Sequence, residues 1–300
     1  LDVRISEPLS GGQEYTPYKS PGAGREAISS PLASSMVITS TTTSTMDTMD
    51  WDTSLLLLRA VPLPSLPTSS PLLWLLVGLA SHLLSSLLLL PPTPTSALSS
   101  KFKAWKWQST YVARMSAGLT GAWALLALYT SPAMRADLML TSSTSATCLV
   151  AFSIGIHSAE ALDMLWQKQP SMLLVHHVFV ILCFAGALFT GKAVGFAVLS
   201  LVTEVNTIFN KTRILHLITG LARSSEEFQQ NAQVNLATFL VRMAIVAWMN
   251  HQATLYYGLI PTPFLFTCGL GLFIVNIWNI SVFRRLCAAD LNMMRKAKTA

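Results

Sequence analysis

The side chains of this sequence that could do chemistry are polar groups set inside long apolar stretches. His176 and His177 are adjacent, and Glu160 and Asp163 lie three residues apart in the preceding stretch. Residues three apart share one face of a helix, so the two carboxylates can present together. Because imidazole changes charge near neutral pH, it can act as a general base that a carboxylate orients. The group therefore fits acyl transfer to an amine or hydroxyl, and it equally fits the binding of a phospholipid headgroup.

Further polar residues recur in other apolar stretches. Charged side chains inside a bilayer are costly unless they are paired or hydrated, so these groups should face one another within a helix bundle. We expect Glu204 to pair with Arg242. The predicted polar, lipid-binding cavity consists of Glu160, Asp163, His176, His177, Glu204, Asn206, Thr207, Asn210, Arg242 and Arg114.

These polar residues can also be interpreted without a lipid-binding cavity. Intramembrane ion pairs and histidine hydrogen bonds can serve only to fix helix packing. A metal site needs three or four ligands, and two histidines with nearby carboxylates are a weak signal, so we expect no metal. His157 is interpreted as a hydrogen-bonded core histidine. No P-loop, GxGxxG, GxSxG or HExxH motif is present, and we expect no cofactor apart from a bound phospholipid.

The composition identifies the elements that must position these groups. Hydrophobic residues make up 52% of the 300 residues and charged residues only 11%, whereas soluble globular chains carry about 25% charged residues. This excludes an ordinary cytosolic enzyme and predicts a polytopic membrane protein. The basic residues form short clusters at the ends of apolar runs, which argues against a nucleic-acid partner. Four cysteines without CxxC spacing argue against disulfides and a zinc ribbon.

Seven apolar stretches approach the roughly 20 residues that a membrane-spanning helix needs. The fold class is therefore predicted to be all-α, a polytopic membrane bundle of about seven transmembrane helices that follows a long, extended polar N-terminal tail. The stretches are residues 71–90, 111–130, 145–166, 171–190, 193–211, 233–255 and 262–283.

Positive charge predicts the orientation of the bundle. With seven spans, twelve Lys and Arg residues fall on one side and only Arg135 and Lys192 in the opposite short loops. Lys and Arg accumulate on the cytosolic or matrix side, so the tail is expected outside and the C-terminus inside.

The chain divides into four predicted regions. Residues 1–70 form a Ser/Thr/Pro-rich tail that would be held by a partner if it is ordered, and residues 71–100 form the first transmembrane helix and a linker. Residues 101–285 form the main bundle, and residues 286–300 a basic tail. Since residue 1 is Leu rather than Met, we expect a chain that was processed by removal of a targeting peptide, or truncated.

Five segments, in this order, resemble the TLC-domain family, which includes ceramide synthases, translocation-associated membrane proteins and lipid-regulatory proteins. The resemblance covers about residues 100–285 and is carried by Trp107–Ser116, Ser153–Glu160, Leu174–His177, Thr203–Arg213 and Asn231–Met243. It implies a helix bundle around a cavity for lipid or acyl chains. By position, His176 and His177 are similar to the paired histidines of the family, and Glu204 and Arg242 are similar to polar residues of the two following helices.

The departures from the family pattern shape the functional expectation. Ceramide synthases carry two aspartates three residues apart after the histidines, whereas Leu201–Thr207 contains no Asp; Ser116 and Glu160 also replace the His and Asp of relatives. We therefore expect a non-catalytic protein that is more similar to the family members that are not ceramide synthases than to the ceramide synthases. Its expected role is a structural, lipid-binding accessory subunit of a larger organellar membrane complex.

Several alternatives remain open at this level. The protein could be an acyl-CoA-dependent lipid acyltransferase that uses His176 or His177, or a lipid transporter or scramblase. The expected partners are membrane lipids and the other subunits of a complex, contacted partly by residues 1–70. A processed N-terminus and a basic inner side favour the mitochondrial inner membrane, with the C-terminus in the matrix; the family resemblance favours the endoplasmic reticulum.

Overall fold

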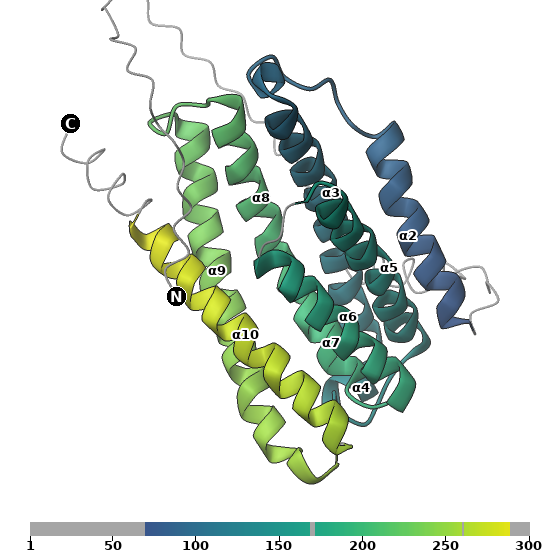
Figure 1. Cartoon of the computed structure of the whole chain (residues 1–300). Helices are drawn as coiled ribbons and strands as arrows, with labels where there is room; N and C mark the ends of the chain where they lie inside the picture. Colours follow the sequence, from purple (N-terminus) through teal and green to yellow (C-terminus); the bar gives the residue numbers. More distant parts are fainter. Residues whose placement is uncertain (1–69, 169–171, 260, 289–300) are drawn as a thin grey trace, which may run out of the picture. The chain divides into compact units, whose positions relative to one another are not determined.

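The computed structural model describes residues 70–168, 172–259 and 261–288, and within these ranges every regular element is helical (Figure 1). The prediction of an all-α membrane bundle is thereby confirmed. Nearly all of the predicted tail 1–70 and most of the predicted basic tail 286–300 lie outside the described residues. The elements are α2 (Pro71–Leu88), η1 (Ala97–Ser99), α3 (Lys101–Thr130), α4 (Pro132–Ala136), α5 (Thr144–Trp166), α6 (Met172–Thr190), α7 (Val194–Val202), α8 (Glu204–Thr219), α9 (Glu226–Leu255), η2 (Tyr257–Leu259) and α10 (Thr262–Leu286).

Five of the described helices are long and apolar enough to cross a membrane, namely α2, α5, α6, α9 and α10. The helix α3 has 30 residues but carries four basic side chains in its first half. The predicted span at 193–211 is divided between α7 and α8. The chain is therefore a multi-pass membrane protein, and the count of seven spans stays a prediction.

Local side chains explain where several helices begin. Ser100, Ser143 and Ser225 each precede a helix and accept a hydrogen bond from the backbone N–H three residues later. Such N-caps satisfy one of the backbone donors that a helix leaves unpaired in its first turn. Gly220 ends α8 with φ of 78°, a left-handed conformation that glycine adopts without steric cost.

The division between α7 and α8 falls at Thr203, next to Glu204. The Ser200 hydroxyl donates to the carbonyl of Ala197 at 2.7 Å, and the Thr203 hydroxyl donates to the carbonyl of Ser200 at 2.6 Å. Hydroxyl groups that bind nearby carbonyls compete with the helical backbone bonds and often bend helices. The sequence pattern predicted one continuous span here; the structure has two consecutive helices that meet at the polar residues.

Two facing glycines let α2 pack closely on α5, the helix with which it makes most of its contacts. An added Cβ would lie 2.0 Å from the Phe152 carbonyl oxygen at Gly78, and 2.1 Å from the Leu75 carbonyl oxygen at Gly155. Small residues at such crossings allow backbones to approach, which is a main source of helix association in membranes. The first predicted span is thus fixed to the bundle through backbone contact.

The described core lies around α5, which is the most buried of the five candidate spans. Leu149 and Val150 of α5 and Val198 of α7 are fully buried in the main hydrophobic cluster. Large apolar side chains such as Leu87 and Phe189 are exposed instead. Apolar exposure of this extent suits a surface that faces lipid rather than water.

Candidate functional site

An apolar cavity of about 190 Å³ lies between α6, α7, α9 and α10. Its wall is mostly aliphatic and aromatic, and it includes Phe184, Ala197, Val246 and Leu272. Cavities with such walls hold apolar ligands, because water placed in them would lack hydrogen-bond partners. We name it the apolar cavity.

A second cavity, of about 180 Å³, lies among α3, α5, α6, α8, α9 and α10, and its wall carries more polar groups than that of the apolar cavity. We name it the polar cavity. It is lined by eight of the ten residues predicted for the site: Glu160, His176, His177, Glu204, Asn206, Thr207, Asn210 and Arg242.

Four side chains line both cavities, so the two spaces adjoin at a polar junction. These side chains are His157, His176, Glu204 and Arg242. A molecule with a polar head and an apolar chain would match this pairing, with its head among the charged groups and its chain in the apolar cavity.

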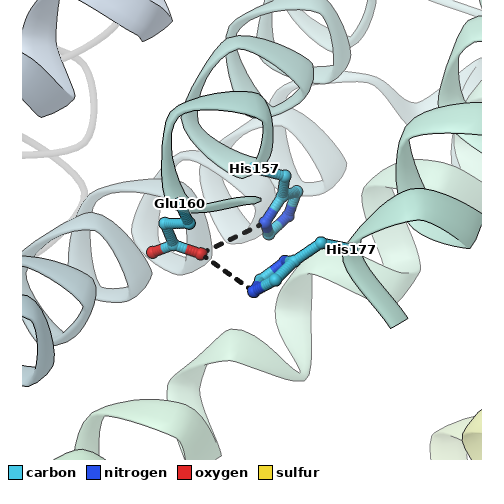
Figure 2. A group of neighbouring side chains, drawn as sticks. All are labelled: His157, Glu160 and His177. Atoms are coloured by element: carbon cyan, nitrogen blue, oxygen red, sulfur yellow. Dashed lines mark ion pairs between the residues drawn. The ribbon is translucent and has the colours of Figure 1, made fainter. Parts of the chain in front are cut away.

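The polar cavity contains a compact group of two histidines and one carboxylate. Figure 2 shows His157 and Glu160 on α5 and His177 on α6, with both rings directed at Glu160. The Glu160 Oε2 atom lies 3.6 Å from His157 Nδ1 and 3.4 Å from His177 Nε2. The side chains of His157, Glu160 and His177 are 11%, 13% and 6% exposed, so the group is shielded from bulk solvent.

His176 occupies a different position from its neighbour. Its ring centroid lies 5.7 Å from that of His177, and it lines both cavities. Its Nδ1 atom is buried with no hydrogen-bond partner among the described residues. Consecutive side chains on a helix project about 100° apart, which explains why only His177 meets Glu160.

Arg242 enters the polar cavity from α9. Its Nη1 donates to the Thr207 hydroxyl on α8 at 3.3 Å, and its Nε is buried with no partner among the described residues. The expected ion pair with Glu204 is not formed within the described part of the chain, although both side chains line the junction. A buried guanidinium with a free donor can bind a carboxylate or phosphate oxygen.

Amide side chains hold the helices around the polar cavity. Asn206 of α8 donates to the Asn235 carbonyl and side-chain oxygens at 3.1 Å each, and to the Thr238 hydroxyl at 3.0 Å. Asn250 of α9 and Asn276 of α10 donate to each other at 3.2 Å. Such interhelical hydrogen bonds fix helix packing inside membranes.

Two of the predicted site residues lie outside both cavities. Asp163 accepts a hydrogen bond from the Trp105 indole at 2.9 Å, which links α5 to α3. The Arg114 guanidinium lies 4.9 Å from the centre of the Tyr111 ring. Although Glu160 and Asp163 lie three residues apart on α5, they have different neighbours: Asp163 bonds to α3, whereas Glu160 lines the polar cavity.

The structure also brings to the site residues that sequence reasoning passed over. His157, interpreted from the sequence as a hydrogen-bonded core histidine and left out of the predicted site, is buried next to Glu160 and lines both cavities; its spacing from Glu160 was the available signal. Lys211, counted only as a loop charge, lines the polar cavity, as does Asn279 from the last apolar stretch. If the histidines are neutral, the polar cavity has no net charge, because its wall carries two carboxylates and two cations. These are Glu160, Glu204, Lys211 and Arg242.

The described residues offer one combination of side chains that could hold a metal ion. His157, Glu160 and His177 each present one ligand atom, and these atoms lie within 4.8 Å of one another. The remaining wall offers Lys211, Arg242, Glu204 and amides, which suit a zwitterionic headgroup.

Known proteins show what the chain is similar to. The family model for the TLC domain matches residues 106–288. TLC domain-containing protein 2 of Danio rerio is 35% identical over 212 residues, which cover 69% of this chain and 84% of that protein. TLC domain-containing protein 2 of Homo sapiens is 32% identical over 68% of this chain and 77% of its own length. TLC domain-containing protein 1 of Homo sapiens is 30% identical over 66% of this chain and 81% of its own length.

No solved structure matches the chain. The helix α2 precedes the matched residues, and the relatives named are not ceramide synthases. The predicted resemblance to the TLC-domain family, and to its members that are not ceramide synthases, is confirmed.

Proposed function

Because the chain belongs to the TLC-domain family, we propose that it is a non-catalytic integral membrane protein that binds a membrane lipid. The observation that carries this proposal is the junction of an apolar cavity with a polar one, where His157, His176, Glu204 and Arg242 line both. One acyl chain would occupy the apolar cavity, and a phospholipid headgroup would meet Arg242 and Lys211.

The charge of the polar cavity supports a zwitterionic headgroup. A phosphate has two cationic side chains available, Lys211 and Arg242, and a headgroup amine has two carboxylates, Glu160 and Glu204. Hydrogen bonds between charged groups are the strong ones, particularly where little water competes. Phospholipids that carry both charges should therefore be retained better than neutral lipids.

Native mass spectrometry of the full chain released from lipid nanodiscs tests this function. The wild type should retain one phospholipid after the bulk lipid is removed. Ala197→Leu, which adds side-chain volume within the apolar cavity, should abolish this retention. Ala122→Leu makes the same change at an exposed position of α3 and should leave it intact. Equal lipid release by the wild type and both variants would disprove the proposal.

A role as an accessory subunit of a larger organellar membrane complex remains part of the proposal. Its partner-binding element would be the tail 1–70, nearly all of which lies outside the described residues. Mild extraction from the native membrane, followed by mass determination and protein identification, tests it. A stoichiometric assembly is expected, and a lone chain would contradict it. The same sample should identify the mitochondrial inner membrane, with the endoplasmic reticulum as the alternative.

A lipid acyltransferase is the second candidate function. It is favoured by the 3.4 Å approach of His177 Nε2 to Glu160 Oε2, because a carboxylate can orient an imidazole that acts as a general base. The absence of Asp from Leu201–Thr207 argues for the non-catalytic role. Acyl transfer from acyl-CoA by purified wild type, lost in His177→Ala, would establish the enzyme; we expect no transfer. Lipid transport stays a further alternative, for which a flux assay in sealed vesicles is decisive.

A further inference from the structure

The side chains of His157, Glu160 and His177 lie close together, but the distances between their polar atoms are longer than those of ordinary hydrogen bonds. Nδ1 of His157 lies 3.6 Å and Nε2 of His177 lies 3.4 Å from Glu160 Oε2. Hydrogen bonds between N–H groups and oxygen are usually about 2.7–3.2 Å long. His157 Nδ1 is buried and has no hydrogen-bond partner among the described residues. Three potential ligand atoms thus converge in ion-pair contacts that are longer than ordinary hydrogen bonds (Figure 2).

The same distances suit atoms that share a metal ion. Zinc binds imidazole nitrogen and carboxylate oxygen at about 2.0–2.2 Å, and tetrahedral geometry then separates neighbouring ligand atoms by about 3.3–3.6 Å. The two separations measured to Glu160 Oε2, 3.6 Å and 3.4 Å, fall at this spacing. All three ligand atoms lie within 4.8 Å of one another.

The two packed helices α5 and α6 place the three potential ligand side chains next to one another. His157 and Glu160 lie three residues apart on α5, so they share a helix face, and His177 comes from the adjacent α6. The three side chains are at most 13% exposed. A site on two packed helices is more rigid than one on loops, and its shielding reduces competition from water.

We propose that His157, Glu160 and His177 bind one divalent transition-metal ion, best suited to Zn²⁺, with a remaining coordination position open to the polar cavity. Two histidines and one carboxylate form a ligand set that zinc commonly uses when it keeps an open position. This differs from the expectation drawn from sequence, which held no metal because two adjacent histidines with nearby carboxylates are a weak signal for a metal site. The proposal does not depend on lipid binding.

Charge gives the ion a role in ligand binding. The lining is neutral when two carboxylates face Lys211 and Arg242, so a divalent ion would leave the polar cavity with a charge of about plus two. An anionic oxygen, from a phosphate or from hydroxide, would offset part of this charge at the open position. The metal site would therefore favour phosphate-bearing ligands over neutral ones.

Metal analysis of the purified full chain tests the proposal. After treatment with a chelator, the protein is titrated with Co²⁺, whose visible absorption reports ligand geometry, and then with Zn²⁺, whose bound amount is measured by elemental analysis. One ion per chain is expected. His157→Gln, Glu160→Gln and His177→Gln should each weaken Co²⁺ binding at least about tenfold.

His216→Gln is the matched control, because His216 also contacts a carboxylate, with Nε2 3.2 Å from Glu227 Oε1, but lies outside both cavities. It should bind Co²⁺ like the wild type. The proposal is overturned if wild type binds neither ion stoichiometrically, or if His216→Gln loses as much affinity as His177→Gln. The wild-type titration decides the matter even if a variant fails to fold. Phospholipid retained by the same samples is measured separately, so failure of the metal site is distinguishable from failure of lipid binding.

Discussion

At the scale of single residues, the two arginines that the sequence predicted for the site have different surroundings. Arg242 lines both cavities and keeps a buried Nε without a partner among the described residues, whereas Arg114 stacks over Tyr111 away from them. Hydropathy alone treated the two as equivalent intramembrane charges. The direction of each side chain depends on which neighbouring helix its face meets, and a single sequence carries no such information.

Removing the Arg242 guanidinium should weaken phospholipid retention. A hydrogen bond to a charged group contributes about 1.5–3 kcal/mol, so Arg242→Met should lower the affinity about tenfold or more. Native mass spectrometry across a series of added phospholipid concentrations measures this change. Arg114→Met removes a comparable charge outside the cavities and should keep wild-type affinity. Equal losses in both variants would point to a general effect of charge.

Asn206 should contribute to stability rather than to ligand binding. Its amide makes three hydrogen bonds to Asn235 and Thr238, and it is only 2% exposed. Asn206→Ala should lower the free energy of unfolding by about 1–2 kcal/mol, as measured by detergent-induced unfolding. Gln229→Ala removes an exposed amide that bonds only to the Ser224 carbonyl, and it should change stability by less than about 0.5 kcal/mol. Wild-type stability of Asn206→Ala would contradict this role.

At the scale of elements, the apolar runs predicted the helices closely because about 20 apolar residues in succession satisfy the bilayer only as a helix. The division at Thr203 was not predictable from hydropathy, since Val194–Val202 and the residues after it are both helical in pattern. It arises from the Ser200 and Thr203 hydroxyls, which bond to backbone carbonyls. The close packing of α2 on α5 was likewise not predictable, because the sequence does not show which neighbouring helix a glycine faces.

The glycine contact between α2 and α5 should be intolerant of any side chain. At Gly155 an added Cβ meets Leu75 and Leu79 backbone atoms at 2.1 and 2.6 Å, so the helices themselves must separate. Gly155→Ala should therefore lower the free energy of unfolding by about 1–3 kcal/mol. At Gly118 the nearest side-chain atom to an added Cβ is 3.9 Å away, and Gly118→Ala should be neutral or stabilising. Thermal unfolding of both variants in nanodiscs checks the difference, and equal midpoints would contradict the tight contact.

At the scale of the whole described bundle, the site depends on helices that are distant in sequence. The polar cavity combines α3, α5, α6, α8, α9 and α10, and the apolar cavity combines α6, α7, α9 and α10. The sequence predicted that polar groups would face one another within the bundle, and eight of the ten named residues line the polar cavity. It did not predict the adjoining apolar cavity, because an internal space arises from packing and leaves no local pattern. It also overlooked Lys211, whose position near a predicted span end resembled an interfacial charge.

The central claim is that one lipid chain enters the bundle, and a phospholipid with a photoreactive group at the end of its acyl chain tests it most directly. After illumination in nanodiscs, peptide mapping should find labels at the wall of the apolar cavity on α6, α7, α9 and α10. Ala197→Leu should remove these internal labels, and Ala122→Leu should leave them. In every sample the exposed faces of α2 and α10 report bulk lipid. Labels confined to those exposed faces in the wild type would contradict the account.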